Sequence, residues 1–77
     1  MVTGLVLVKL MSGKEKQALA RLKNIKSIIH MSAVFGRWDL VLDMETEDLP
    51  QLSDIVVNQI RVIPGVLSTE TLVTTSI

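Results

Sequence analysis

The sequence has 77 residues, enough for one small domain whose core gives only marginal stability unless a disulfide, a metal or a partner chain adds to it. It contains no cysteine and one histidine, so a disulfide is excluded and neither a metal site nor a cofactor is expected. Its formal net charge is zero, which removes the long-range field that attracts nucleic acid. We therefore expect a partner chain to supply the missing stability.

The apolar segments are too short and too interrupted for a membrane protein. No stretch reaches the roughly 20 apolar residues that a membrane helix needs. Residues 1–11 are apolar but lack the basic leading region of a signal peptide, and Lys9 interrupts them. The expected location is the cytoplasm, with no membrane contact.

The first predicted elements are a strand and a helix. Residues 2–11 form a near-continuous aliphatic run, which is typical of a central strand buried on both faces. Ser12 and Glu15 then stand at the spacing of a capping box, which predicts the start of a first helix of about three turns. The apolar residues at helical spacing are Ala18, Leu19, Leu22 and Ile25.

A β-hairpin is predicted next. Residues 27–35 alternate, so that Ile29, Met31, Ala33 and Phe35 are expected on one face of a second strand. A short turn opens on Gly36, and a third strand follows. The residues expected on one face of that strand are Trp38, Leu40, Leu42 and Met44.

The chain ends in a second helix and a last strand. Asp48 has the position of an N-cap, Pro50 suits the first turn, and Gln51 lies three residues after the cap. Pro64 and Gly65 stop this helix, and residues 66–77 are expected as a Thr-rich strand. The predicted apolar stripe of the helix consists of Leu52, Ile55, Val56, Ile60 and Ile63.

The order β-α-β-β-α-β predicts one ferredoxin-like α+β domain over residues 1–77, with both helices on one face of a four-stranded antiparallel sheet. Since two helices cover only one face, apolar side chains are expected on the other, and burying each one is worth about 1.5–3 kcal/mol. We therefore expect an obligate homodimer that packs sheet on sheet. Besides the first strand, the residues in question are Ile29, Met31, Phe35, Trp38, Leu40 and Leu42.

Two segments resemble a known family. They are Val-Phe-Gly-Arg-Trp-Asp-Leu at residues 34–40 and Ile-Arg-Val-Ile-Pro-Gly-Val-Leu-Ser-Thr-Glu-Thr at residues 60–71. With them the chain resembles the RAM (regulation of amino-acid metabolism) domain, the effector-binding half of Lrp/AsnC transcription regulators. Members usually carry an N-terminal helix-turn-helix, whereas this sequence begins with the first strand. The resemblance thus implies a stand-alone effector domain that does not itself bind DNA.

The resemblance also implies partners and a site. Dimers are expected to assemble into octamers or similar rings, to bind a small amino acid between dimers, and to associate with full-length regulators. Asp39 is expected to bind the ammonium of the amino acid, and Gly36 to let the backbone approach the ligand closely. Trp38 is expected to form a wall of the pocket. The hydroxyls assigned to the carboxylate belong to Ser68, Thr69 and Thr71.

Each of these residues also has a purely structural interpretation. Asp39 is equally well explained by hydrogen bonds to turn amides, Gly36 by a turn requirement, and Trp38 by an interface core. The hydroxyl residues suit a strand in any case. The expected function is sensing and oligomerisation, not catalysis. The alternatives are a small dimeric α/β-barrel enzyme of the monooxygenase type, with a deep cavity containing His30, and a ligand-free assembly scaffold.

Overall fold

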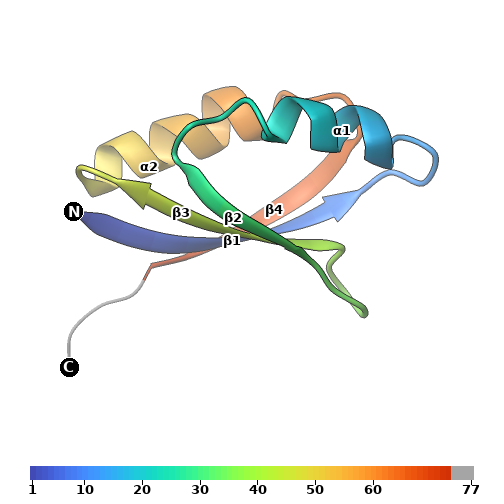
Figure 1. Ribbon diagram of the computed structural model, residues 1–77, viewed down its shortest axis with the longest axis horizontal. Helices are drawn as coiled ribbons and strands as arrows, with labels where there is room; N and C mark the ends of the chain where they lie inside the picture. The colour runs from blue at the N-terminus through green and yellow to red at the C-terminus, as the bar shows by residue number, and fades with distance from the viewer. Residues whose placement is uncertain (74–77) are drawn as a thin grey trace.

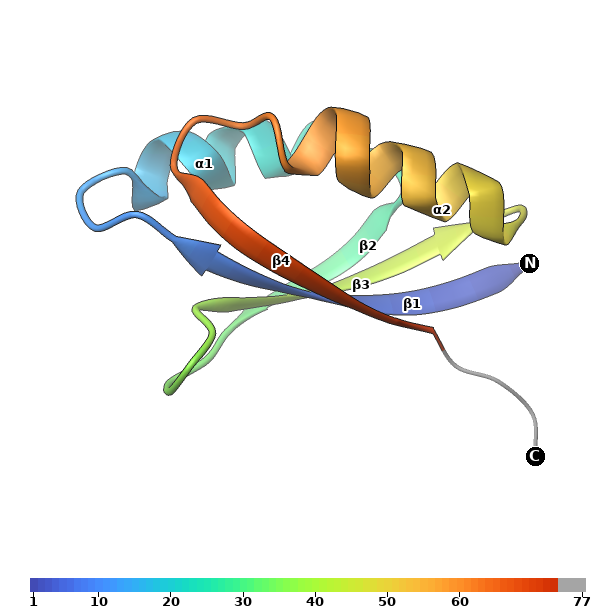
Figure 2. The ribbon, with the colours of Figure 1, turned by 180° about the vertical axis from the view of Figure 1, so that it is seen from behind.

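A computed structural model places two helices over one face of a four-stranded sheet (Figures 1 and 2). The structure describes residues 1–73. This order and layering confirm the predicted ferredoxin-like fold. In chain order the elements are β1 (Val2–Leu10), α1 (Glu15–Leu22), β2 (Ile28–Ala33), β3 (Leu40–Thr46), α2 (Leu49–Ile55), the single π-helical turn η1 (Val56–Ile60) and β4 (Val66–Val73).

The sheet has the strand order β2-β3-β1-β4, and all neighbours are antiparallel. β1 lies inside the sheet, as its aliphatic run predicts, with Val6 opposite Leu42 of β3 and opposite Thr71 of β4. The last strand ends at Val73, and the remainder of the predicted strand lies outside the described residues. Neither helix within residues 1–73 is long and apolar enough to cross a membrane.

The core lies between the helices and one face of the sheet. Alternate residues of β1 and β3 point into it, and Val6, Val8, Leu42 and Met44 are fully buried. The predicted apolar stripe of the second helix is confirmed, since all its members are buried against this face. The full set of buried apolar residues is Val6, Val8, Leu10, Ala18, Leu22, Leu40, Leu42, Met44, Leu52, Ile55, Val56, Ile60 and Ile63.

The two helices begin differently. Asp48 caps α2 as predicted, because its Oδ1 accepts a hydrogen bond of 2.8 Å from the backbone N–H of Gln51. The capping box predicted for α1 is wrong: Lys14 is the N-cap, and it makes no side-chain cap bond. Gly13, at φ +89°, turns the chain before the helix, and Glu15 accepts a hydrogen bond from the Gly13 N–H. α1 has 8 residues, so it is about two turns long and not three.

A β-bulge changes which side chains of β2 face the core. The pairing shifts between Ile28, which is opposite Met44, and His30, which is opposite Asp43, so that Ile29 is the extra residue. Ile28 and Met31 consequently pack against the core, while Ile29 is exposed. The predicted shared face of Ile29 and Met31 is therefore wrong. Strand alternation holds only while the pairing register is uninterrupted.

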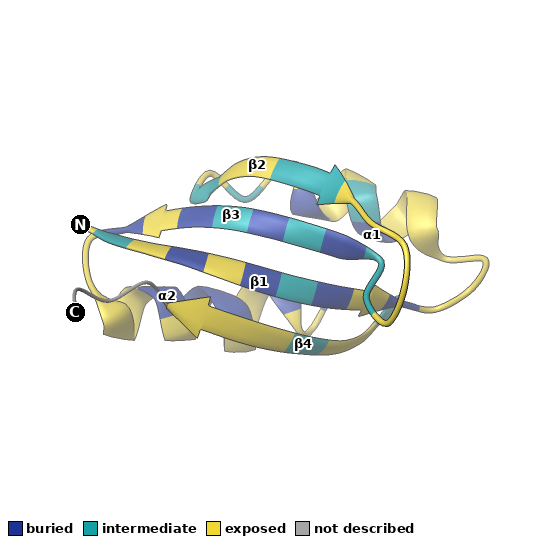
Figure 3. Cartoon of the chain, turned by 90° about the horizontal axis from the view of Figure 1, so that it is seen from below, coloured by how far each residue is buried: buried dark blue, intermediate teal, exposed yellow. Residues whose placement is uncertain are grey.

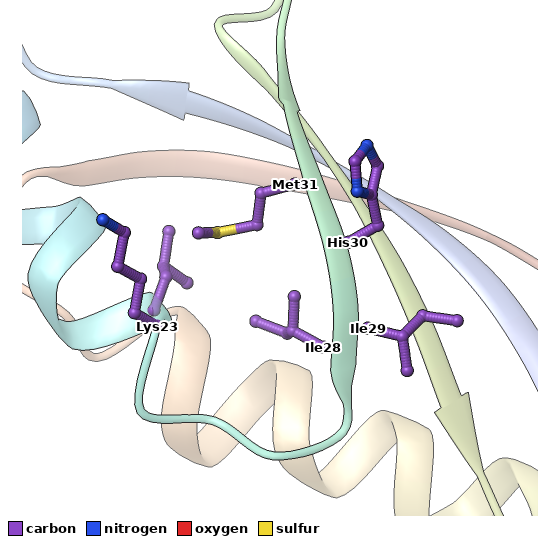
Figure 4. Close-up of a pocket in the computed structure, with 6 residues that line it drawn as sticks. Lys23, Ile28, Ile29, His30 and Met31 are labelled. Carbon is purple, nitrogen blue, oxygen red and sulfur yellow. The ribbon is translucent and has the colours of Figure 1, made fainter.

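The face of the sheet that no helix covers is less apolar than predicted. Leu40, Leu42 and Met31 point toward the helices, and Phe35 lies beyond the end of β2. Figure 3 shows the sheet from this uncovered side. Along β1 and β3, half-buried or exposed residues, which point to this side, alternate with buried residues, which point toward the helices. From the register, its apolar residues are Leu5, Leu7, Val41 and Leu72, and Ile29 lies on the same side of β2 as His30 (Figure 4). The surrounding polar residues are Thr3, Lys9, His30, Ser32, Asp43, Glu45, Ser68 and Glu70.

Candidate functional site

The residues predicted to bind a ligand lie on two segments at the same end of the sheet. One segment is the loop of residues 34–39 between β2 and β3, and the other is the start of β4. Val8 of β1 lies between them, because it is opposite Leu40 on one side and Thr69 on the other. The loop bends away from the helices, toward the side of the uncovered face (Figures 1 and 2).

Asp39 ties the loop to β1. Its Oδ2 accepts a hydrogen bond of 2.8 Å from the backbone N–H of Leu10, and its own N–H donates to the carbonyl of Val8 at 2.9 Å. β3 begins one residue later, so the Leu10 N–H would lack a partner in the β1–β3 ladder without this carboxylate. The carboxylate of Asp39 thus accepts from a backbone amide, but the predicted turn amide is the wrong partner, because the amide belongs to β1. The Oδ1 atom remains as an acceptor.

Gly36 and Trp38 shape the same loop. Gly36 has φ +117°, a conformation that L side chains rarely adopt, so the predicted turn requirement is present. A Cβ built on Gly36 would meet nothing within 4 Å, which leaves space beside the backbone there. Trp38 is half-buried, whereas Phe35 is fully exposed. The loop therefore presents a large aromatic side chain to solvent.

The three hydroxyl residues of β4 do not share a face. Ser68 is opposite Lys9, on the uncovered face. Thr69 and Thr71 are opposite Val8 and Val6, whose side chains point toward the helices. In a strand, successive side chains point to opposite faces, so Ser68 and Thr69 face different sides of the sheet.

The structure adds Arg61, which was not predicted, to this segment. Its Nε donates a hydrogen bond of 2.9 Å to Oγ1 of Thr69. A hollow of about 260 Å³ lies beside this pair, lined by Arg61, Val66, Leu67, Ser68 and Thr69. Arg61 precedes the Pro64–Gly65 turn, and its only signal in the sequence is a lone cation in an otherwise uncharged segment from residue 55 to residue 69.

Asp39 and the start of β4 do not converge within one protomer. β1 runs between them, so their backbones are two strand spacings apart, about 10 Å. β1 therefore separates these two polar segments within one protomer.

His30 lies at the surface of the protomer and not in a deep cavity among the described residues. It contributes to an open hollow of about 330 Å³ between the end of α1 and the edge strand β2. Figure 4 shows His30 and Ile29 on one side of β2, whereas Lys23, Ile28 and Met31 lie on the other side, toward α1. In the described part of the chain no three His, Cys, Asp or Glu residues are grouped closely enough to hold a metal ion.

One family model and several solved structures match this chain. The family model described as "Lrp/AsnC ligand binding domain" matches residues 3–77. The crystal structure of FFRP-DM1 is 28% identical with a TM-score of 0.91, covering 97% of this chain and 100% of that one. TTHA0845 from Thermus thermophilus is 26% identical with a TM-score of 0.92, covering 100% of this chain and 96% of that one.

A more distant structure resembles the chain in fold alone. It is the transcriptional regulator NMB0573 from Neisseria meningitidis in complex with L-Met, at 16% identity and a TM-score of 0.90. The alignment covers 97% of this chain and 50% of that one. A search of curated proteins finds no significant match.

Proposed function

Because this chain belongs to the Lrp/AsnC ligand-binding domain family, we propose that it is an amino-acid-sensing and oligomerisation module. In this proposal residues 1–77 act as a single cytoplasmic domain, which forms homodimers through the uncovered sheet face. Dimers join into octamers or similar assemblies and hold a small amino acid where they meet. Full-length regulators of the family are the proposed further partners.

The uncovered face supports the dimer. Leu5 and Leu72 remain 38% and 48% exposed, and Leu7 and Val41 are half-buried. Fully burying one such side chain is worth about 1.5–3 kcal/mol. A two-fold axis presents every residue twice, so completing the burial yields on the order of 3–9 kcal/mol. Association costs about 4–15 kcal/mol, and the face alone therefore leaves the dimer marginal.

The loop of residues 34–39 supplies further contact area in this proposal. It extends past the sheet on the side of the uncovered face (Figure 2), and its Phe35 is fully exposed among the described residues. A large aromatic side chain contributes much of the energy where it is buried in an interface. Lys9 on the same face carries a charge opposite to that of Asp43 and Glu70, which suits pairing between two copies.

The single observation that carries the binding proposal is the position of two polar segments on either side of β1, which we propose as two half-sites. Asp39 at the loop and the polar groups at the start of β4 suit the ammonium and the carboxylate of an amino acid, and they lie on opposite sides of β1. A second protomer that brings its β4 segment to the loop of the first would complete the site. The L-Met in the Neisseria regulator supports an amino acid as the ligand.

The competing functions receive less support. An enzyme of the monooxygenase type would need an enclosed cavity with polar groups directed into it, and the hollow beside His30 is open to solvent. The family itself is a regulatory ligand-binding domain. A ligand-free scaffold would need only the uncovered face, without the half-sites.

Two measurements test the proposal together. Sedimentation at micromolar concentration is expected to show a homodimer that associates further. Thermal unfolding is recorded with each of the twenty standard L-amino acids, and one or a few of them are expected to stabilise the protein. A ligand present at 100 times its dissociation constant stabilises the folded state by about 2.7 kcal/mol. That corresponds to a rise in Tm of more than about 10 °C for a domain of this size. A folded monomer would refute the proposed dimer. An unchanged Tm with all twenty amino acids would refute amino-acid binding and favour the ligand-free assembly scaffold.

A further inference from the structure

We propose that Arg61 is the carboxylate-binding residue of this module and that Thr69 holds its guanidinium in place. The inference rests on the proposed amino-acid function and names the group that would recognise one end of the ligand. It starts from the hydrogen bond of 2.9 Å between Arg61 Nε and Thr69 Oγ1, at the rim of the 260 Å³ hollow.

The π-helical turn η1 sets the position of Arg61. The backbone N–H of Arg61 donates to the carbonyl of Val56 at 2.9 Å, five residues back, where a regular α-helix would use Val57. The wider turn inserts one residue and thus rotates the residues after it by about 100° relative to an uninterrupted α-helix. Ile60 and Ile63 stay buried, and Arg61 reaches β4. π-Helical turns inside α-helices occur frequently at functional sites.

The bond to Thr69 leaves most of the guanidinium available. Arginine has five N–H donors in a planar fork, and the Nε–H alone is used by Thr69. The terminal N–H groups match the two oxygens of a carboxylate, an arrangement that a single ammonium of lysine does not reproduce. Because Thr69 already orients the fork, less side-chain entropy is lost when a ligand binds.

The surroundings suit a small ligand with one negative end. Val66 and Leu67 form apolar walls beside the guanidinium, and the hollow is smaller than the roughly 300–1,000 Å³ of pockets for drug-sized molecules. A single cation balances the single charge of a carboxylate. This assignment also changes the role of Thr69, which acts on the ligand through Arg61 and is a positioning residue.

The test compares an amino acid with its amide. The amino acid that gives the largest rise in Tm among the twenty is titrated calorimetrically into the wild-type protein, and so is the same compound with its α-carboxylate converted to a carboxamide. Both titrations are repeated with Arg61→Gln. The matched control is Arg21→Gln, which removes an exposed arginine from a separate hollow beside Pro64.

We expect the wild-type protein to bind the acid at least tenfold more tightly than the amide. Arg61→Gln should weaken binding of the acid about ten- to hundredfold and abolish the preference, since it removes a charge-assisted hydrogen-bond donor. Arg61→Lys keeps the charge without the fork and should fall between the two. Thr69→Val should weaken binding in the wild-type background but not in the Arg61→Gln background, because the two residues act as a unit.

The outcomes separate this inference from the function on which it rests. Unchanged affinity and unchanged preference for the acid in Arg61→Gln, with the wild type binding normally, would overturn the role of Arg61 alone. A wild-type protein that binds none of the twenty amino acids would overturn both proposals. An equal loss in Arg21→Gln would also refute the assignment. Circular dichroism and sedimentation of each variant verify that fold and assembly are retained.

Discussion

The carboxylate of Asp39 accepts a hydrogen bond of 2.8 Å from the backbone N–H of Leu10, a residue 29 positions earlier in the chain. The bond closes the end of the sheet at the point where β3 stops pairing with β1. It holds the loop of residues 34–39 against the strand that separates the two proposed half-sites. One side chain thus belongs to the framework of the protein and to its candidate site.

Replacing Asp39 with alanine is expected to destabilise the fold. The Leu10 N–H, which is partly buried, would lose its acceptor, and leaving such a group unpaired costs about 1–3 kcal/mol. Urea unfolding measures the change in the free energy of unfolding. Asp39→Asn keeps an oxygen acceptor at the same place, so its loss should stay below that of Asp39→Ala.

The same pair of variants separates structure from binding. Asp39→Asn lacks the negative charge that an ammonium group requires, so amino-acid affinity should fall at least tenfold although the fold is retained. Asp54→Asn, an exposed carboxylate on α2, is the control and should bind normally. Wild-type affinity in Asp39→Asn would remove Asp39 from the proposed site.

The two turn glycines are predicted to differ in their tolerance of alanine. Gly36→Ala places a side chain at φ +117° in open space, so only the backbone strain of about 1–3 kcal/mol is expected. Gly65→Ala causes a similar backbone strain, because Gly65 has φ +101°. In addition, its new Cβ would lie 2.8 Å from Lys14 Cβ and 3.2 Å from the Lys14 carbonyl oxygen. Thermal unfolding should therefore show a larger loss for Gly65→Ala. The reverse order would contradict the geometry of these two turns.

The proposed dimer surface is tested with two leucines of almost equal exposure. Leu72 on the uncovered face is 48% exposed, and Leu49 at the start of α2 is 50% exposed. Leu72→Asp removes apolar burial at two symmetric positions and is expected to raise the dimer dissociation constant about tenfold or more. Leu49→Asp should leave it unchanged. Sedimentation equilibrium gives both values, and equal effects of the two changes would exclude a specific role for the sheet face.

The N-cap of α2 allows a prediction of stability that is independent of the site. Asp48→Ala removes the acceptor of the Gln51 N–H and should cost about 1 kcal/mol in the free energy of unfolding. Glu47→Ala changes the adjacent exposed carboxylate and is expected to have little effect. Denaturant unfolding of the two variants side by side checks the difference.

Local patterns were sufficient for the order of the elements. The aliphatic run of β1, the Asp48 cap and the apolar stripe of the second helix each depend on residues near one another in sequence. The positive φ of Gly36 also follows from a local turn requirement. For this reason the fold class and the second helix could be predicted from the residues alone.

Pairing between distant residues decided the rest. The bulge at Ile29 exchanges the faces of β2, because the register against β3 determines where each side chain points. The Asp39–Leu10 and Arg61–Thr69 bonds depend on which strand or helix end lies beside which, and no local pattern contains that information. The sequence by itself therefore determined the elements and their order, since these follow from periodicity and capping. The tertiary structure alone decided which face is uncovered and where the residues of the proposed half-sites lie, since these follow from register and packing.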